Sequence, residues 1–143
     1  MFDTSALIDV GKELERLAPS NVYPEAMYRS SIGRYYYACY HASKSLCIRN
    51  ADWDNKDKSS HKAVVSALRK KSRFLASMLD DLRLLREHAD YHVWRCKELV
   101  TDDRHHPRCD CDWDPDTRSN CAKASNIAKW IADELKKSRS QAP

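Results

Sequence analysis

Glycine is scarce in this sequence, since only Gly11 and Gly33 occur among 143 residues. So few glycines argue against the many tight turns of an all-β fold and against the glycine-rich loops that cradle phosphates. No apolar run approaches the length needed to cross a bilayer. The first residues lack a basic stretch followed by an apolar core, so we expect no signal peptide, no membrane association and a cytoplasmic protein.

Charge and cysteine content narrow the class further. Charged side chains form 32% of the chain and are interspersed, as is typical of the exposed faces of helices. The net charge of +4 is compatible with an anionic partner and equally with an ordinary solvated surface. Without a secretion signal, the six cysteines are expected to be reduced. The length suits a single domain, 1–143, with a core spanning about 3–137.

Apolar residues recur every three or four positions in four long stretches, which predicts four long helices. Asp3 or Thr4 can cap the first helix, Pro24 suits the first turn of the second, and Ser72 restarts the chain before the fourth stretch of helix. The first expected helix ends near residue 17, and the others cover about 24–48, 61–71, 72–97 and 117–137. A loop is expected at 101–119. The fold class is therefore all-α, an antiparallel helical bundle of four long helices plus a short helix.

The stretch 72–97 has the clearest helical period, with its apolar residues on one face. Arg86 and His92 fall within roughly 60° of the centre of that face, one on each side. Arg83 is expected to point the opposite way, into solvent. An arginine and a histidine thus border a seam that is either buried or faces a partner.

Two motifs resemble the HEPN superfamily (higher eukaryotes and prokaryotes nucleotide-binding domain). The first, GRYYYACYHAS at 33–43, is similar to the family's second-helix signature, with Gly33 in place of the usual serine. The second, LREHADYH at 85–92, matches the family's arginine followed by alanine-aspartate-tyrosine. The order and separation of the two motifs fit, and the resemblance covers most of the chain. It implies a helical bundle of the same kind.

Many HEPN proteins are metal-independent endoribonucleases whose shared motif is an arginine, four to six residues and a histidine. Arg86 and His92 satisfy the motif with five residues between them, and Arg83 and His88 satisfy it with four. The position on the helix face favours the first pair. Metal-free RNA cleavage needs a proton-transfer group near neutral pKa and a fixed cation beside the phosphate, which suit histidine and arginine. The resemblance implies Arg86 and His92 as catalytic residues, without metal or cofactor.

Other residues are assigned supporting roles. Asp90 is placed to orient His92 or Arg86, and Tyr91 to donate to a phosphate. Tyr37 and His41, in the first motif, are supporting candidates, although aromatic residues in a helix more often pack in a core. A locally basic stretch offers RNA contacts, and a solvated helix face has the same composition. The RNA-binding candidates are Lys62, Arg69, Lys70, Lys71 and Arg73.

The resemblance also implies partners: RNA, a second copy in a homodimer with a composite site, and an antitoxin in a toxin–antitoxin or phage-defence setting. The alternative is a non-catalytic HEPN module that binds nucleotide, RNA or a nucleotidyltransferase-type partner. A third interpretation is a small metal-binding regulator, because one loop gathers zinc-ligand residue types. Their spacing is poor, so no metal site is predicted. These loop residues are His105, His106, Cys109 and Cys111.

Overall fold

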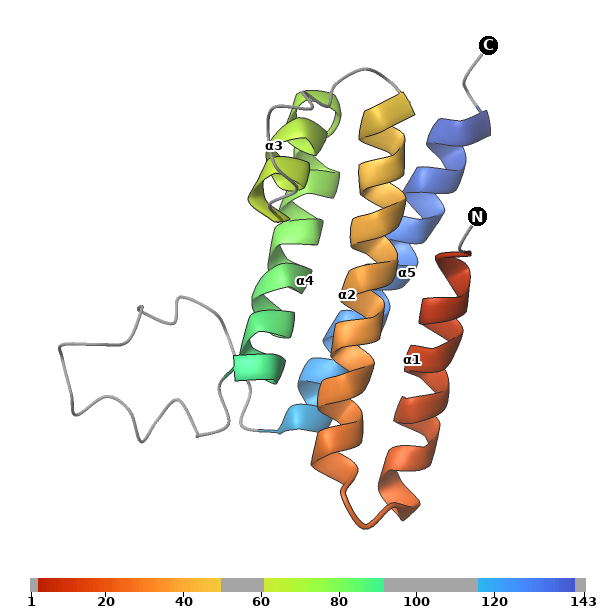
Figure 1. Ribbon diagram of the computed structural model, residues 1–143, viewed down its shortest axis with the longest axis vertical. Coiled ribbons are helices and arrows are strands. Elements are labelled where there is room, and N and C mark those ends of the chain that lie inside the picture. Colours follow the sequence, from red (N-terminus) through yellow and green to blue (C-terminus); the bar gives the residue numbers. More distant parts are fainter. Residues whose placement is uncertain (1–2, 50–60, 92–115, 141–143) are drawn as a thin grey trace, which may run out of the picture.

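The computed structural model describes residues 3–49, 61–91 and 116–140, and all regular structure in these ranges is helical (Figure 1). The prediction of an all-α bundle of four long helices and a short one is confirmed. No described helix is long and apolar enough to span a bilayer. The elements are α1 (Ser5–Leu17), the 3₁₀ turn η1 (Ala18–Ser20), α2 (Pro24–Arg49), α3 (His61–Lys71), α4 (Arg73–Tyr91) and α5 (Thr117–Ser140).

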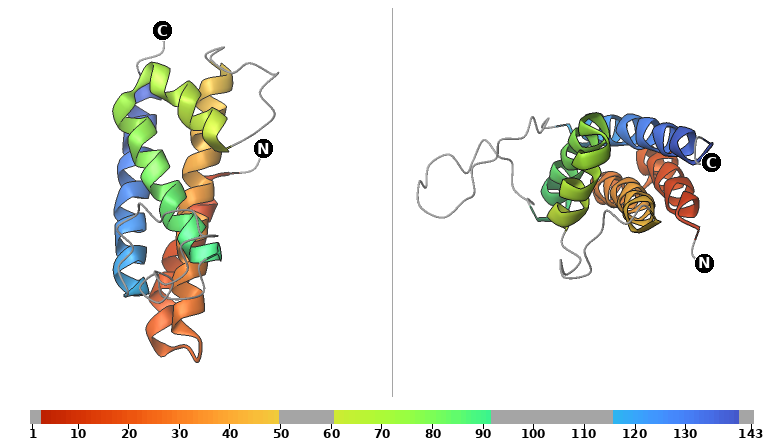
Figure 2. Two further views of the ribbon diagram at one scale, coloured as in Figure 1. Left: turned by 90° about the vertical axis from the view of Figure 1, so that its left-hand side faces the viewer. Right: turned by 90° about the horizontal axis from the view of Figure 1, so that it is seen from above.

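Helix α2 is the central element of the bundle. It contacts α1, α3, α4 and α5, whereas α1 has no contact with α4 in the described part of the chain. The long helices run alternately down and up, and the short α3 packs against the first half of α4 (Figures 1 and 2). Because neighbours surround α2, buried side chains occur around most of its circumference, including the buried Tyr28, Tyr35, Tyr36 and Tyr40.

The predicted apolar face of 72–97 is buried within this one chain. Leu79 and Leu82 on α4 are fully buried, as is Ile131 on α5. The sequence allowed this seam to be buried or to face a partner. In the described part of α4, it is buried inside the bundle. The other buried apolar residues of α4 are Leu75, Ala76, Met78, Leu85 and Ala89.

Polar side chains start three of the helices. Asp3 Oδ1 accepts hydrogen bonds from the Ser5 backbone N–H at 2.9 Å and from Ser5 Oγ at 2.7 Å, whereas Thr4 makes no capping bond. Ser72 Oγ accepts from the Leu75 N–H at 3.2 Å, as a cap does. Asp116 Oδ1 accepts from the Arg118 N–H at 3.0 Å, at the start of α5. Residues 117–119 are therefore helical, so the predicted start of the last helix near 117 is confirmed and the predicted end of the loop at 119 is wrong. Residues 92–97 and 101–115 lie outside the described residues.

Helices α1 and α2 approach closely at Gly11. A Cβ atom at this position would lie 2.8 Å from Tyr35 Cε1, so only glycine fits without a shift of the tyrosine. Ser31 Oγ donates to the Gly11 carbonyl at 2.7 Å, and the Tyr35 hydroxyl donates to Glu15 Oε2 at 2.7 Å. These contacts set the position of α2 relative to α1.

Arg29 joins the start of α2 to the last turn of α4. Its Nη1 donates to the carbonyl oxygens of His88 at 3.1 Å and Ala89 at 3.0 Å. Its Nη2 lies 2.9 Å from Glu25 Oε1, one turn earlier on α2. Carbonyl groups at a helix end attract cations, so this contact stabilises the part of α4 that carries the second motif.

Candidate functional site

Arg86, near the end of α4, is held by three side chains. Its Nε lies 2.6 Å from Asp90 Oδ2, an ion pair in which the N–H bond is not directed at the carboxylate. Its Nη2 donates to the Tyr37 hydroxyl at 2.8 Å and to the Tyr91 hydroxyl at 3.5 Å. The guanidinium carbon lies 5.3 Å and 5.2 Å from the centres of these two rings, within cation–π range. The Arg86 side chain is only 13% exposed.

The guanidinium of Arg86 stays charged, and one of its nitrogens has no partner in the part of the chain that the structure describes. Burial alone would lower the pKa of Arg86, but the charge of Asp90 and the phenols of Tyr37 and Tyr91 raise it overall. Among the described residues, Nη1 of Arg86 has no hydrogen-bond partner. Unlike Nε, it is not a fully buried atom that lacks a partner. Arg86 therefore presents a fixed positive charge whose Nη1 has no partner among the described residues.

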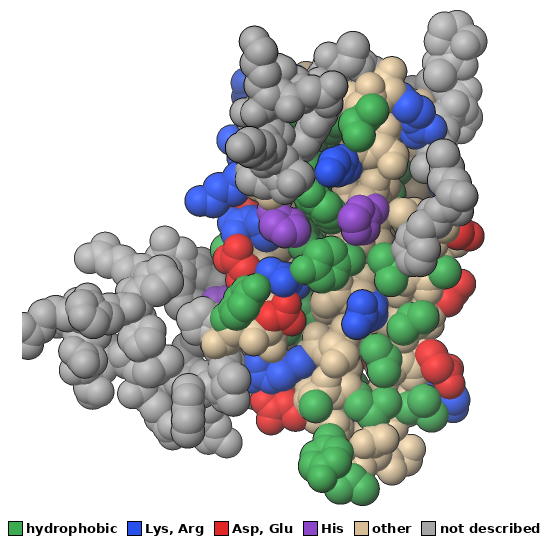
Figure 3. All heavy atoms as spheres, in the orientation of Figure 1, with side chains coloured by type: hydrophobic (Ala, Val, Ile, Leu, Met, Phe, Trp, Pro, Cys, Tyr) green, Lys and Arg blue, Asp and Glu red, His purple; other side chains and the backbone are tan. Residues whose placement is uncertain are grey.

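Tyr37 is the centre of a cluster that combines α2, α3 and α4. The His41 ring stacks on it at 6.2 Å with 26° between the planes, and the His61 ring meets it edge-on at 6.2 Å. Figure 3 shows two histidine side chains close together on this face, above a group of mixed basic, acidic and apolar side chains. We call the residues gathered around Tyr37 and Arg86 the Arg86 cluster; its members are Tyr36, Tyr37, His41, His61, Arg86, Asp90 and Tyr91.

His61 is the member that the sequence did not reveal. Its Nδ1 lies 2.5 Å from the hydroxyl oxygen of the buried Tyr36, and its ring centre lies 4.6 Å from that of Tyr40. Burial lowers the pKa of His61 below the usual 6.5, and the charges of Arg86 and Arg83 lower it further. His61 is the first residue of α3, and only the fold brings the start of that helix onto α2.

The structure brings together most of the predicted site. Tyr37, Asp90 and Tyr91 all contact Arg86, and His41 joins them by stacking on Tyr37. The contact of Asp90 with Arg86 matches one of the two roles predicted for that carboxylate. His92 lies outside the described residues, as do the four histidines and cysteines of the 101–119 loop.

The expectation that Arg83 points into solvent is wrong. Its side chain is 13% exposed, as little as that of Arg86, because α3 packs against that side of α4. Arg83 pairs with Asp80 Oδ1 at 2.8 Å and with Glu87 Oε1 at 2.5 Å. His88, its partner in the shorter arginine–histidine spacing, is 4% exposed. Two carboxylates thus engage Arg83, whereas one carboxylate and two phenols engage Arg86.

The predicted RNA contacts fall into two groups. Lys62 and Arg69 line a groove of about 230 Å³ between α3 and α4, together with Asp80 and Arg83. The others, on the last turn of α3 and the first residue of α4, are exposed and do not line this groove: Lys70, Lys71 and Arg73. Two of the five candidates, Lys62 and Arg69, therefore share this groove with Arg83. Both lie on α3, the helix that begins at His61.

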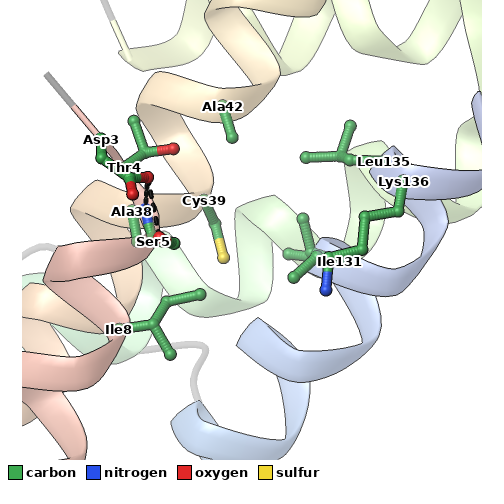
Figure 4. Close-up of a pocket in the computed structure, with 11 residues that line it drawn as sticks. Asp3, Thr4, Ser5, Ile8, Ala38, Cys39, Ala42, Ile131, Leu135 and Lys136 are labelled. Atoms are coloured by element: carbon green, nitrogen blue, oxygen red, sulfur yellow. Dashed lines mark hydrogen bonds between the residues drawn. The ribbon is translucent and has the colours of Figure 1, made fainter. Parts of the chain in front are cut away.

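A second cavity, of about 120 Å³, lies between the start of α1, the middle of α2 and the end of α5 (Figure 4). Ile8, Ala42 and Leu135 give it an apolar wall, and the Cys39 side chain reaches it from α2. Burial raises the pKa of the Cys39 thiol to about 12, so the thiol stays protonated. The cavity offers packing space and no reactive nucleophile.

In residues 3–49, 61–91 and 116–140, no group of three or more metal-ligand side chains is found. Cys121, which follows the 101–119 loop, is fully buried, and burial raises the pKa of its thiol to about 11. Comparisons of the chain with protein-family models, with curated proteins and with solved structures give no match. The fold and site define a helical-bundle protein with an arginine–tyrosine–histidine cluster. Its resemblance to HEPN proteins stays a prediction carried by the two motifs.

Proposed function

We propose that this chain is a metal-independent endoribonuclease of the HEPN type, in which Arg86 stabilises the scissile phosphate and His92 transfers a proton. The observation that carries the proposal is the fixed guanidinium of Arg86. Asp90, Tyr37 and Tyr91 hold it in one place, and its Nη1 has no partner among the described residues. A cation already in position needs no reorganisation when negative charge develops on a phosphate.

The reaction that suits these groups is attack of the RNA 2′-hydroxyl on the adjacent phosphorus. The 2′-oxygen loses its proton to a base, the P–O bond to the 5′-oxygen breaks, and the leaving oxygen takes up a proton. The products are a 2′,3′-cyclic phosphate and a 5′-hydroxyl end. Histidine is suited to both proton transfers near neutral pH, and arginine to the charge on the phosphate oxygens.

The groove lined by Lys62, Arg69 and Arg83, with Asp80 as its one carboxylate, supports an RNA substrate, because an excess of cations attracts phosphates without regard to base sequence. The homodimer with a composite site, the antitoxin partner and the toxin–antitoxin or phage-defence setting belong to the same proposal. They rest on the resemblance of the motifs.

One observation favours the alternative, a non-catalytic module that binds nucleotide or RNA or docks to a nucleotidyltransferase-type partner. Nε and Nη2 of Arg86 are already engaged by Asp90, Tyr37 and Tyr91. Such a corner also serves to hold α2 and α4 together. In that case Arg86 has a structural role and RNA remains intact.

Incubation of the purified chain with mixed RNA in EDTA distinguishes the two functions. We expect cleavage to cyclic-phosphate products by the parent chain, reduced on the order of 10²–10³-fold by Arg86→Ala and His92→Ala. Arg16→Ala is the matched control, because Arg16 also pairs with a carboxylate on its own helix, at 2.6 Å from Glu13, and α1 does not contact α4. Intact RNA, or equal cleavage by all variants, would contradict the proposal.

A further inference from the structure

We propose that His61 is an uncharged hydrogen-bond donor of the Arg86 cluster, which binds a phosphate group through its Nε2–H beside the guanidinium of Arg86. For the identity of that phosphate, an RNA phosphodiester, the inference rests on the proposed function. The donor itself follows from the contacts of Tyr36, which has not been assigned a role so far.

Tyr36 determines which nitrogen of His61 carries the proton. The tyrosine is 1% exposed, and its hydroxyl has one hydrogen-bond partner among the described residues, Nδ1 of His61 at 2.5 Å. If Nδ1–H donated to the phenol oxygen, the buried phenol hydrogen would have no acceptor, which is unfavourable. The hydroxyl therefore donates, Nδ1 accepts, and the neutral imidazole of His61 carries its proton on Nε2.

The surroundings keep His61 uncharged at neutral pH. A second proton would have to occupy Nδ1 and would remove the acceptor of the Tyr36 hydroxyl. Burial disfavours the imidazolium, as do Arg86, Arg83 and the neighbouring His41, and only the carboxylate of Glu87 favours it. The other groups that face the ring are the phenols of Tyr37 and Tyr40, whose rings lie 6.2 Å and 4.6 Å away.

The two proposed donors contact the same tyrosine. Tyr37 contacts Arg86 through its hydroxyl, which accepts from Nη2, and its ring lies 6.2 Å from that of His61 in a T-shaped arrangement. Tyr37 and His61 are both partly exposed, so this part of the cluster is open to solvent. A phosphate has several acceptor oxygens and can accept from a guanidinium and a neutral imidazole together. A neutral donor also binds without adding a second positive charge next to Arg86.

Two substitutions at His61 separate the donor from mere packing. His61→Gln keeps an N–H donor near the position of Nε2, whereas His61→Asn places its amide near the position of Nδ1. The probe is a short RNA with a 2′-O-methyl group on every ribose, which retains the phosphates and cannot be cut. We expect roughly tenfold weaker binding by fluorescence anisotropy for His61→Asn and little change for His61→Gln.

Nitrogen NMR of the imidazole of His61 tests the same inference without any substitution or activity. We expect a protonated Nε2 and an unprotonated Nδ1 at pH 7, and a mixture of tautomers in Tyr36→Phe. A proton on Nδ1 in the parent chain, equal effects of the two His61 variants, or no binding of the probe would overturn the inference. Probe binding with this tautomer but intact RNA in the EDTA assay would contradict the proposed cleavage and leave the donor role standing.

Discussion

The two glycines provide a matched pair of substitutions that tests how α2 is positioned. Both lie inside helices, so alanine removes the same backbone freedom from the unfolded chain at either position. At Gly11 the new Cβ atom would lie 2.8 Å from Tyr35 Cε1 and 3.0 Å from its Cδ1. At Gly33 no atom would lie within 4 Å of it. Only the first substitution therefore meets another side chain.

The expected free energies differ in sign. Alanine in place of a mid-helix glycine stabilises by about 1 kcal/mol. At Gly33 nothing opposes this gain, so Gly33→Ala should raise the free energy of unfolding by roughly 0.5–1 kcal/mol. At Gly11 the fully buried Tyr35 must shift, at a cost of roughly 1–3 kcal/mol, and its 2.7 Å bond to Glu15 weakens, at a cost of about 1 kcal/mol. Gly11→Ala should therefore destabilise by roughly 1–3 kcal/mol.

Urea unfolding followed by circular dichroism measures both changes. We expect the midpoints to move in opposite directions, with thermal midpoints shifting by about 2–4 °C per kcal/mol. The double variant Gly11→Ala, Tyr35→Leu should lose less stability than the two single losses added together, because the smaller side chain removes the clash. Destabilisation by Gly33→Ala, or shifts of the same sign in both alanine variants, would refute this account of the α1–α2 contact.

Three further outcomes are expected. Tyr37→Phe removes the acceptor of Arg86 Nη2 but keeps the ring, so initial rates of RNA cleavage should fall by roughly 3–10-fold while the circular dichroism spectrum is unchanged. The pKa of His61 is lower in the folded state than its ordinary value of 6.5, so the unfolded chain binds the proton first as the pH falls. Stability should therefore decrease as the pH falls below about 6.5, and urea unfolding of His61→Gln across pH 5–8 should lack this component, whereas an unchanged pH profile would contradict it. Burial raises the thiol pKa of Cys39 to about 12 and of Cys121 to about 11, so peptide mapping should show alkylation of both only after unfolding.

The helices were predictable because their apolar periods and end signals are local properties of the chain. Pro24 begins α2 as expected, and Ser72 caps α4 by accepting a hydrogen bond from the Leu75 N–H. The side chain of Asp3, and not that of Thr4, makes the hydrogen bonds at the start of α1. That choice depends on side-chain conformations that the residue types alone do not specify.

Helical spacing made the site predictable along α4, and the resemblance of the motifs added Tyr37 and His41 on α2, but neither pointed to α3. Arg86, Asp90 and Tyr91 are neighbours along α4, so their contacts follow from helical spacing. His61 contacts Tyr36 across 25 positions of sequence, and no periodicity reveals such a contact. The error at Arg83 has a related cause, because a helix with one apolar face was assumed to be covered on that face alone, whereas α3 packs against another side of α4.

The bonds from Arg29 to the carbonyls of His88 and Ala89 have a consequence for how the cluster meets a ligand. Arg29 lies two helical turns before Tyr37 on α2, and the two carbonyls belong to the turn that carries Arg86 and Asp90. A slide of α4 along α2 by one turn would break both bonds, so the register between the two walls of the cluster is established when the chain folds. A phosphate that binds as proposed would meet donors already in place, so little entropy would be lost in ordering the protein.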